Sequence, residues 1–170
     1  YPLTDARRDL AQKETVPSAD TSGQNKVTTF TYSTQGLLTS RQEQGRIGGV
    51  VTTYTTGFSY DAKGRLLTAD GPRTDVTDVT TNTYHPDSDS DLARRGQLAT
   101  VTDAAANVTT YAGGSAPFNA YTLYGQPLRV SDPNNVLREM TYDNRGRLTL
   151  STLKGVTGDP TDLSTGYEYD

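Results

Sequence analysis

Residues 142–148 read Tyr-Asp-Asn-Arg-Gly-Arg-Leu, and residues 60–66 repeat this phrase as Tyr-Asp-Ala-Lys-Gly-Arg-Leu. Weaker copies lie at residues 32–38, Tyr-Ser-Thr-Gln-Gly-Leu-Leu, and at residues 121–128, Tyr-Thr-Leu-Tyr-Gly-Gln-Pro-Leu. Internal repeats indicate the fold before any single residue is considered, because each copy is one supersecondary unit that packs against its neighbours.

Two more copies complete the pattern. One begins at Tyr84, and the acidic residues 85–91, His-Pro-Asp-Ser-Asp-Ser-Asp, enlarge its turn before Gly96. Another opens at Tyr169-Asp170, so we expect the chain to be a piece of a longer repeat protein, cut at both ends. The first tyrosines of successive copies are 28, 24, 37, 21 and 27 residues apart. This irregular spacing excludes a rigid solenoid code and suits a sheet of hairpins with variable loops.

Each phrase has the chemistry of a β-hairpin. The residues before the tyrosine are β-branched or aromatic, as in Val-Thr-Thr-Phe-Thr-Tyr at 27–32, and such residues favour strands. An aspartate at the first turn position bonds its own backbone two residues on, and the glycine adopts a left-handed conformation at little cost. Arg65 and Arg147 can pair across the turn with Asp61 and Asp143, although an exposed pair is worth less than about 1 kcal/mol.

The sequence therefore predicts an all-β fold, an array of antiparallel β-hairpins forming part of an extended, winding sheet. The repeats should cover residues 27–170, after an irregular lead-in over residues 1–26. Within the lead-in, Thr4 to Glu14 has a helical alternative in which Asp5 caps a short turn. Strands should end and restart on either side of the turn phrases. The expected ends are Tyr32, Tyr60, Tyr84, Tyr121 and Tyr142, and the expected restarts are Leu37, Arg65, Gln97, Pro127 and Arg147.

The structural repeat is carried by its tyrosines, turn residues and leucines. The residues assigned to it are Tyr32, Gly36, Tyr60, Asp61, Gly64, Arg65, Leu66, Tyr84, Gly96, Tyr121, Gly125, Leu128, Asp132, Tyr142, Asp143, Gly146, Arg147 and Leu148. Tyrosine and leucine should form the repeating core pair, so we expect Tyr60, Tyr142, Leu66 and Leu148 to be mostly buried. Positive φ angles are expected at Gly36, Gly64, Gly125 and Gly146.

Composition limits the possible functions. Val, Leu, Ile and Phe make up roughly 18% of the residues, below the level of a typical compact core, whereas Thr (29) and Tyr (11) are abundant. The absence of cysteine excludes disulfide, zinc-thiolate and thiol chemistry. A net charge of −4 with scattered Lys and Arg argues against a nucleic-acid surface. No apolar run is long enough for a membrane span, and no signal peptide is visible.

Candidate sites are weak. Asp87, Asp89 and Asp91 alternate as in calcium loops, but the expected glycine and the later bidentate glutamate are missing, so a solvated loop is favoured. His85 is the only histidine, and a turn role is favoured over a metal site. No Gly-x-Ser-x-Gly motif is present, and the Gly-rich stretches 45–49 and 111–114 read as loops rather than phosphate sites. We therefore expect no catalytic residue, no metal and no cofactor.

The turn phrase together with Asp132-Pro133-Asn134 and the Thr-Tyr-Asp that follows resembles the RHS or YD-repeat proteins. Residues 128–136 followed by 140–143 match that pattern, as do residues 70–72 followed by 80–84. Asn135 stands where the family usually has glycine, and asparagine tolerates the left-handed conformation. The resemblance covers about residues 27–170.

The resemblance implies a piece of a very large secreted or surface-associated bacterial protein. In this family the repeats form a β-sheet that winds into a hollow shell around a C-terminal toxin or effector domain, as in insecticidal toxin complexes and polymorphic toxins. The expected partners are neighbouring repeats of the same polypeptide and an enclosed toxin domain. The alternative is an adhesion module in which tyrosine faces bind cell-surface glycans. Buried tyrosines favour the shell, and a row of exposed tyrosines around a groove favours the adhesin.

Overall fold

The computed structural model describes residues 5–7, 9–17, 25–47, 49–111, 120–155 and 161–170. Over these residues the chain forms strands and turns, with no helix. The strands are β1 (Lys13–Val16), β2 (Lys26–Tyr32), β3 (Leu38–Ile47), β4 (Val50–Tyr60), β5 (Leu66–Asp70), β6 (Val79–Tyr84), β7 (Leu98–Thr102), β8 (Val108–Thr110), β9 (Arg129–Ser131), β10 (Leu137–Tyr142), β11 (Leu148–Leu153) and β12 (Leu163–Gly166).

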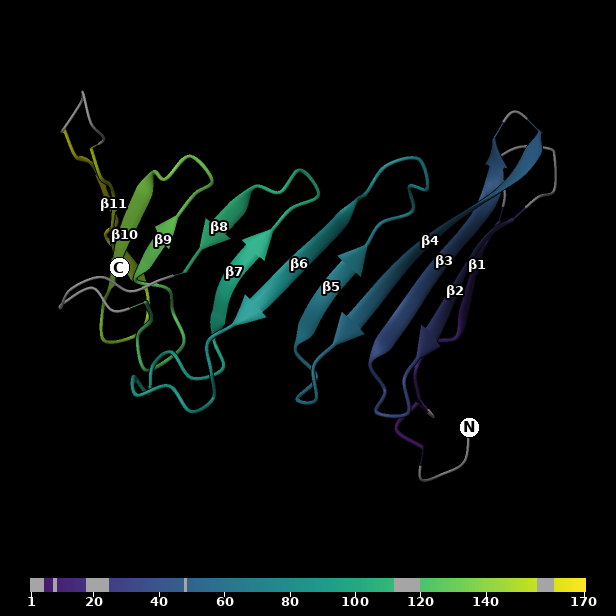
Figure 1. Cartoon of the computed structure of the whole chain (residues 1–170), viewed down its shortest axis with the longest axis horizontal. Coiled ribbons are helices and arrows are strands. Elements are labelled where there is room, and N and C mark those ends of the chain that lie inside the picture. The colour runs from purple at the N-terminus through teal and green to yellow at the C-terminus, as the bar shows by residue number, and fades with distance from the viewer. Residues whose placement is uncertain (1–4, 8, 18–24, 48, 112–119, 156–160) are drawn as a thin grey trace. The chain divides into compact units, whose positions relative to one another are not determined.

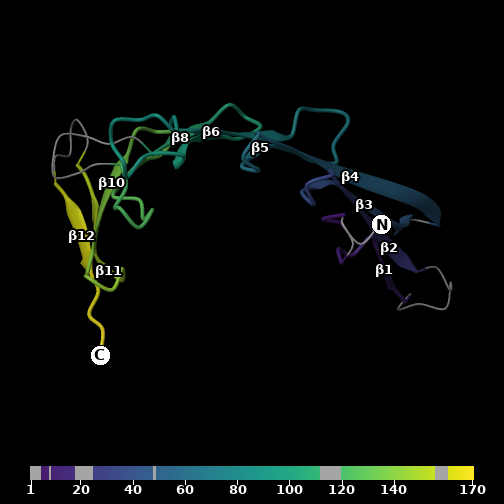
Figure 2. The ribbon, with the colours of Figure 1, turned by 90° about the horizontal axis from the view of Figure 1, so that it is seen from below.

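The strands follow one another in the sheet in the order in which they occur along the chain (Figure 1). Neighbouring strands run antiparallel, so the chain is a series of hairpins and the predicted all-β hairpin array is confirmed. The chain divides into two compact units, residues 1–81 and 82–170, with the boundary inside β6. In Figure 2 the strands of each unit form a single layer.

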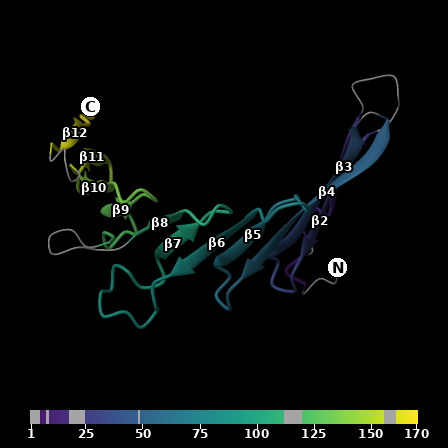
Figure 3. The ribbon, with the colours of Figure 1, turned by 45° about the horizontal axis from the view of Figure 1, so that its top comes forward.

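The first unit contains the longest hairpin. β3 and β4 pair from Ser40 opposite Gly57 to Ile47 opposite Val50. β2 pairs with β3 as far as Val27 opposite Gln44, and β5 pairs with β4 only from Gly57 to Tyr60. The distal part of this hairpin therefore extends beyond both flanking strands, as Figure 3 shows for β4 and β5.

The predicted strand ends are confirmed with one exception. Strands β2, β4, β6 and β10 end at phrase tyrosines, and β3, β5, β7 and β11 begin one residue after the predicted restart. The fourth copy forms only an isolated bridge between Tyr121 and Pro127. Proline lacks the backbone N–H that a strand ladder needs, so the return strand β9 begins later, at Arg129.

Two other expectations need correction. The lead-in was expected to be irregular, but β1 pairs with β2 from Lys13 opposite Thr29 to Val16 opposite Lys26. Lys13 and Glu14, the end of the possible helix, lie in this strand, and Asp5 instead accepts a hydrogen bond from the backbone N–H of Arg7 (2.8 Å). The Gly-rich stretch 45–49 is not all loop, because backbone pairing continues β3 to Ile47. Of the stretch 111–114, only Tyr111 lies within the described residues.

The core is thin. Among the described residues, the buried hydrophobic side chains are Ala93, Ala120 and Tyr121. Tyr60, Leu66, Tyr142 and Leu148 are mostly but not completely buried, as expected. A single layer of strands leaves one face without a covering layer, so large side chains on it keep some contact with solvent.

The turn glycines are confirmed in the left-handed region. Gly36, Gly64, Gly125 and Gly146 have φ between 77° and 80°. The same conformation occurs at Asn135 (φ 61°), as expected, and at Ala106 (φ 63°), which the sequence did not suggest. Alanine in this region is strained by about 1–2 kcal/mol, because its Cβ approaches the following carbonyl oxygen.

The strain at Ala106 predicts opposite results for two substitutions at equivalent turn positions. Ala106→Gly should stabilise the protein by about 0.5–1 kcal/mol, since relief of strain exceeds the added entropy of the unfolded chain. Gly146→Val should destabilise it by about 1–3 kcal/mol. Urea unfolding of the two variants measures both effects, and a destabilising Ala106→Gly would contradict this account of the turn.

Candidate functional site

The turns are built on one repeated set of hydrogen bonds. In the turn at 61–65, the Asp61 N–H donates to the Arg65 carbonyl, and the Gly64 N–H donates back to the Asp61 carbonyl (both 3.0 Å). The Asp61 carboxylate accepts from the backbone N–H groups of Lys63 (2.8 Å) and Arg65 (2.9 Å). The turn at 143–147 has the same bonds. Each turn is therefore closed by its own backbone and side chain.

The predicted ion pairs across these turns are confirmed. Arg65 Nε lies 2.6 Å from Asp61 Oδ2, and Arg147 Nε lies 2.7 Å from Asp143 Oδ2. The backbone N–H of each arginine, together with its guanidinium, holds the pKa of the aspartate below its usual value. The carboxylates thus stay charged in mildly acidic solution and keep their turns closed.

The same turn occurs where the sequence analysis did not identify it. Residues 103–107 have the pattern, with the Asp103 N–H donating to the Asn107 carbonyl and the Ala106 N–H donating to Asp103 (both 3.0 Å). The aspartate spacing, Asp-x-x-x followed by Asn, was the available signal. Two turns that the sequence did indicate are closed by the same backbone bonds. These are residues 132–136, with Asp132 and Asn135, and residues 122–126, with Thr122 in place of the aspartate.

The enlarged turn between β6 and β7 keeps this closure. The His85 N–H donates to the Gln97 carbonyl (2.8 Å), and the Gly96 N–H donates to the His85 carbonyl (3.3 Å). His85 and Gly96 therefore occupy the positions of Asp61 and Gly64, with the inserted residues between them. Gly96 also has a positive φ of 68°.

The acidic residues of this insert serve the loop itself. Asp89 accepts hydrogen bonds from the Asp91 N–H and from the Arg94 guanidinium (both 2.9 Å), and Asp91 accepts from the Ala93 N–H (3.0 Å). The bonds to Asp89 lower the pKa of that carboxyl. In the part of the chain that the structure describes, no group of three or more His, Cys, Asp or Glu side chains is arranged to hold a metal ion.

His85 belongs to a small aromatic cluster. Its Nε2 lies 2.9 Å from the Tyr111 carbonyl oxygen, and its ring meets Tyr121 edge-on at 6.4 Å. Tyr111 stacks on Tyr121 at 6.3 Å, and Ala93 and the fully buried Ala120 complete the cluster. Burial raises the pKa of Tyr121 to about 12. The only histidine is therefore a packed turn residue.

A second repeated contact joins each hairpin to the one before it. The hydroxyl groups of five phrase tyrosines donate to backbone carbonyl oxygens of the preceding repeat, each over 2.8 Å. The pairs are Tyr32 with Ala11, Tyr60 with Leu38, Tyr121 with Leu98, Tyr142 with Pro127, and Tyr169 with Leu148. We refer to this contact as the tyrosine clamp. Three of the acceptors are the first residues of return strands.

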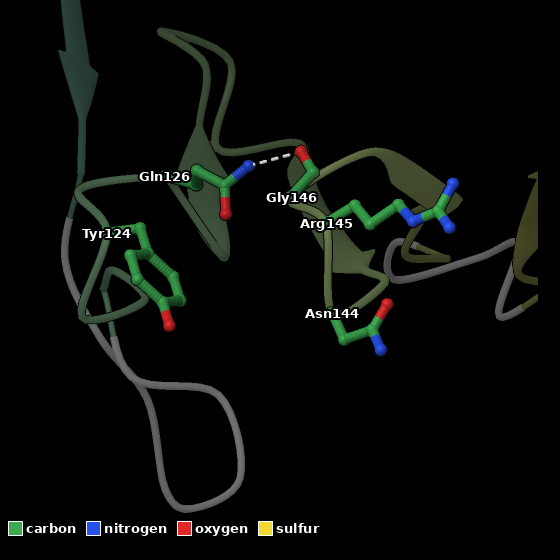
Figure 4. A pocket seen from close by; sticks show the side chains of 5 residues that line it. All are labelled: Tyr124, Gln126, Asn144, Arg145 and Gly146. Carbon is green, nitrogen blue, oxygen red and sulfur yellow. Dashed lines mark hydrogen bonds between the residues drawn. The ribbon is translucent and has the colours of Figure 1, made fainter.

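The residue after a turn glycine lies against the next turn in several repeats. A Cβ on Gly64 would lie 3.5 Å from the Leu37 side chain. On Gly125 it would lie 2.9 Å from Gln97, and on Gly146 it would lie 3.0 Å from Gln126. The Gln126 amide also donates to the Gly146 carbonyl (Figure 4). The arginine after Gly146 lies over the Tyr169 ring, 4.5 Å from its centroid.

One turn tip departs from this pattern. Leu123 and Tyr124 occupy the middle of the turn at 122–126 and are 79% and 88% exposed. An open hollow of about 430 Å³ lies between Tyr124, Gln126 and the turn at 144–146. Figure 4 shows the Arg145 side chain pointing away from Tyr124, so the two do not converge on one point.

The fold has well-defined structural neighbours. A crystal structure of TcdB2–TccC3–Cdc42 matches 94% of this chain with a TM-score of 0.61 at 20% identity. A Photorhabdus luminescens Tc holotoxin pore carrying a TccC3 mutation matches with a TM-score of 0.60, and TcdB2–TccC3–TEV with 0.59, both at 20% identity and 94% coverage. The chain shares the fold of these Tc toxin chains.

The chain spans 8% of the length of these neighbours. Their fold agrees with the resemblance drawn from the turn phrases. No protein-family model matches the sequence, and no curated protein matches it. None of the described residues forms a helix long and apolar enough to cross a membrane.

The tyrosine clamp predicts a cost for losing a single hydroxyl. Tyr142→Phe should lower the free energy of unfolding by about 0.5–1.5 kcal/mol, because its hydrogen bond to the Pro127 carbonyl is lost. Tyr124→Phe is the matched control, since Tyr124 is 88% exposed, and it should change stability by less than about 0.5 kcal/mol. Equal effects of the two variants in urea unfolding would refute the clamp.

The burial of Tyr121 predicts loss of stability in alkali. Its folded-state pKa is about 12, above the usual value of about 10, so the folded state holds this proton more tightly than the unfolded state. Stability should therefore be unaffected by this group below pH 10 and fall as the pH rises from about 10 to 12. Phenolate absorbance should show a step near pH 12 that Tyr121→Phe removes. A Tyr121 step near pH 10 in the folded protein would show that the ring is solvated.

Proposed function

We propose that this chain is a wall segment of an RHS/YD-repeat β-shell that encloses a toxin or effector domain, and that it has no catalytic activity of its own. The tyrosine clamp is the observation that carries the proposal. Five tyrosine hydroxyls are directed to the backbone of the preceding hairpin instead of toward a ligand. A wall needs such contacts between successive hairpins, because each hairpin alone is too small to be stable.

The neighbours support this proposal at the level of the fold. They are structures of a Tc holotoxin pore and of TcdB2–TccC3, and the match extends over nearly all of this chain. A secreted location of the parent protein, with neighbouring repeats and an enclosed toxin domain as its partners, belongs to the same proposal.

The outer strands also fit a wall segment. Every residue of β1 and β12 is exposed, and β12 pairs on its described side only with β11. Exposed strand edges accept further strands. In a shell, the preceding and following repeats of the polypeptide would occupy these edges.

Protease protection of the native polypeptide that contains this chain tests the proposal. The enclosed segment should resist added protease in the wild type and become sensitive in Gly146→Val, which opens a wall turn, while Tyr124→Phe should leave protection unchanged. A native polypeptide without any protected segment would overturn the encapsulation role. A hydrolytic or transfer activity lost together with one side chain of this chain would overturn the absence of catalysis.

A second candidate function, glycan binding, is favoured only by the hollow at Tyr124. An exposed tyrosine face beside amide side chains suits a sugar ring. Glycan-array binding that Tyr124→Ala abolishes would support this function. Binding that survives Tyr124→Ala, or no binding, would leave the wall segment as the better reading, because the phrase tyrosines are engaged in clamps.

A further inference from the structure

The distal half of β4 has an open backbone edge. β4 pairs with β3 from Val50 to Gly57. On its other side, β4 pairs with β5 only from Gly57 to Tyr60. Residues 50–56 therefore have a strand on one side, and among the described residues none pairs with the other side. β5 ends there because Gly71 and Pro72 follow Asp70 and turn the chain toward β6.

The direction of the open groups follows from the hairpin register. Ile47 and Val50 are opposite each other across a two-residue loop, so they form a hydrogen-bonded pair, as do alternate residues along β4. The intervening residues Val51, Thr53 and Thr55 direct their backbone N–H and C=O groups away from β3. Three residues thus offer six hydrogen-bonding groups in a row.

This edge lacks the usual protection against pairing. Natural edge strands carry charges, prolines or bulges, but no charged residue and no proline occurs from Val50 to Tyr60. The register with β3 is also regular from Gly57 to Val50. In addition, Val50, Val51 and Tyr54 are 67%, 51% and 44% exposed. An uncharged, β-branched edge without a bulge is suited to receive another strand.

We propose that this edge pairs with the same edge of a second copy of the chain. The open segment is symmetric about Thr53, because three residues lie on either side of it between the turn at Gly49 and the start of β5 pairing at Gly57. Two copies related by a two-fold axis would pair Thr53 with Thr53 and Val51 with Thr55, forming six backbone hydrogen bonds. No like charges meet, because the segment has none.

The pairing should be weak and reversible. A contact between two seven-residue edges buries far less than the roughly 1,200 Å² of a standard protein interface. Sedimentation velocity of the full chain should therefore show a dimer that grows with concentration. This inference does not depend on the proposed shell function.

A single cysteine tests the register, because the chain has no native cysteine. Thr53→Cys should form a symmetric disulfide dimer under mild oxidation, since opposed residues of a hydrogen-bonded antiparallel pair lie about 5.5 Å apart, within disulfide range. Thr55→Cys is the matched control and should stay monomeric, because the two copies of residue 55 would be four positions, or roughly 13 Å, apart. The double variant Val51→Cys, Thr55→Cys should cross-link again.

A charge variant tests the same edge without covalent chemistry. Thr53→Lys should weaken dimerisation at least tenfold, because two ammonium groups would meet across the two-fold axis. Thr31→Lys, which adds the same charge at an exposed threonine of β2, should leave it unchanged. A wild-type chain that stays monomeric at all soluble concentrations would overturn the proposal. So would Thr55→Cys cross-linking as fast as Thr53→Cys, since that indicates a contact without the two-fold register.

Discussion

The structure depends on one polar contact, the tyrosine hydroxyl that donates to a carbonyl of the preceding hairpin. Strand pairing alone joins hairpins through the middle of the sheet and leaves their turns free. The clamp fixes the turn end of each hairpin against its neighbour. Because donor and acceptor occupy corresponding positions in each repeat, the contact recurs although the loops differ in length. A tyrosine at the last strand position is therefore needed for both its ring and its hydroxyl.

A single layer of strands explains the composition. Without a second layer there is little apolar surface to bury, so few large aliphatic side chains are needed and threonine can fill both faces. Threonine hydroxyls bond one another across strands, as Thr83 with Thr100 and Thr141 with Thr149 do. Stability then comes from many local hydrogen bonds and small contacts, each worth about 1 kcal/mol or less. Order is thus distributed over the turns and strand pairs, with one small aromatic cluster around Tyr121.

The sequence predicted what depends on local chemistry. Tyrosines marked strand ends and glycines marked left-handed turns, because backbone conformation and strand propensity are properties of a few adjacent residues. The acceptors of the tyrosine hydroxyls were not predictable, since Leu38 and Tyr60 meet only through the sheet register. Ala106 was missed because alanine rarely adopts a positive φ. His85 was expected in a turn, but its closing hydrogen bonds were not predictable, because their partners Gly96 and Gln97 lie beyond the insert. The incomplete burial of Tyr60 and Leu66 follows from the absence of a second layer, which no local pattern reports.

The enlarged turn between β6 and β7 shows that loop length and sheet geometry are independent. The two hydrogen bonds that close a five-residue turn also close the segment from His85 to Gln97. Lengthening a loop by a factor of about 2.5 costs only roughly 0.8 kcal/mol of chain entropy. New sequence can therefore be accepted between the closing pair while the register of the flanking strands is kept. Such a turn gives evolution, or an engineer inserting an epitope, a place to add a surface element without redesigning the sheet.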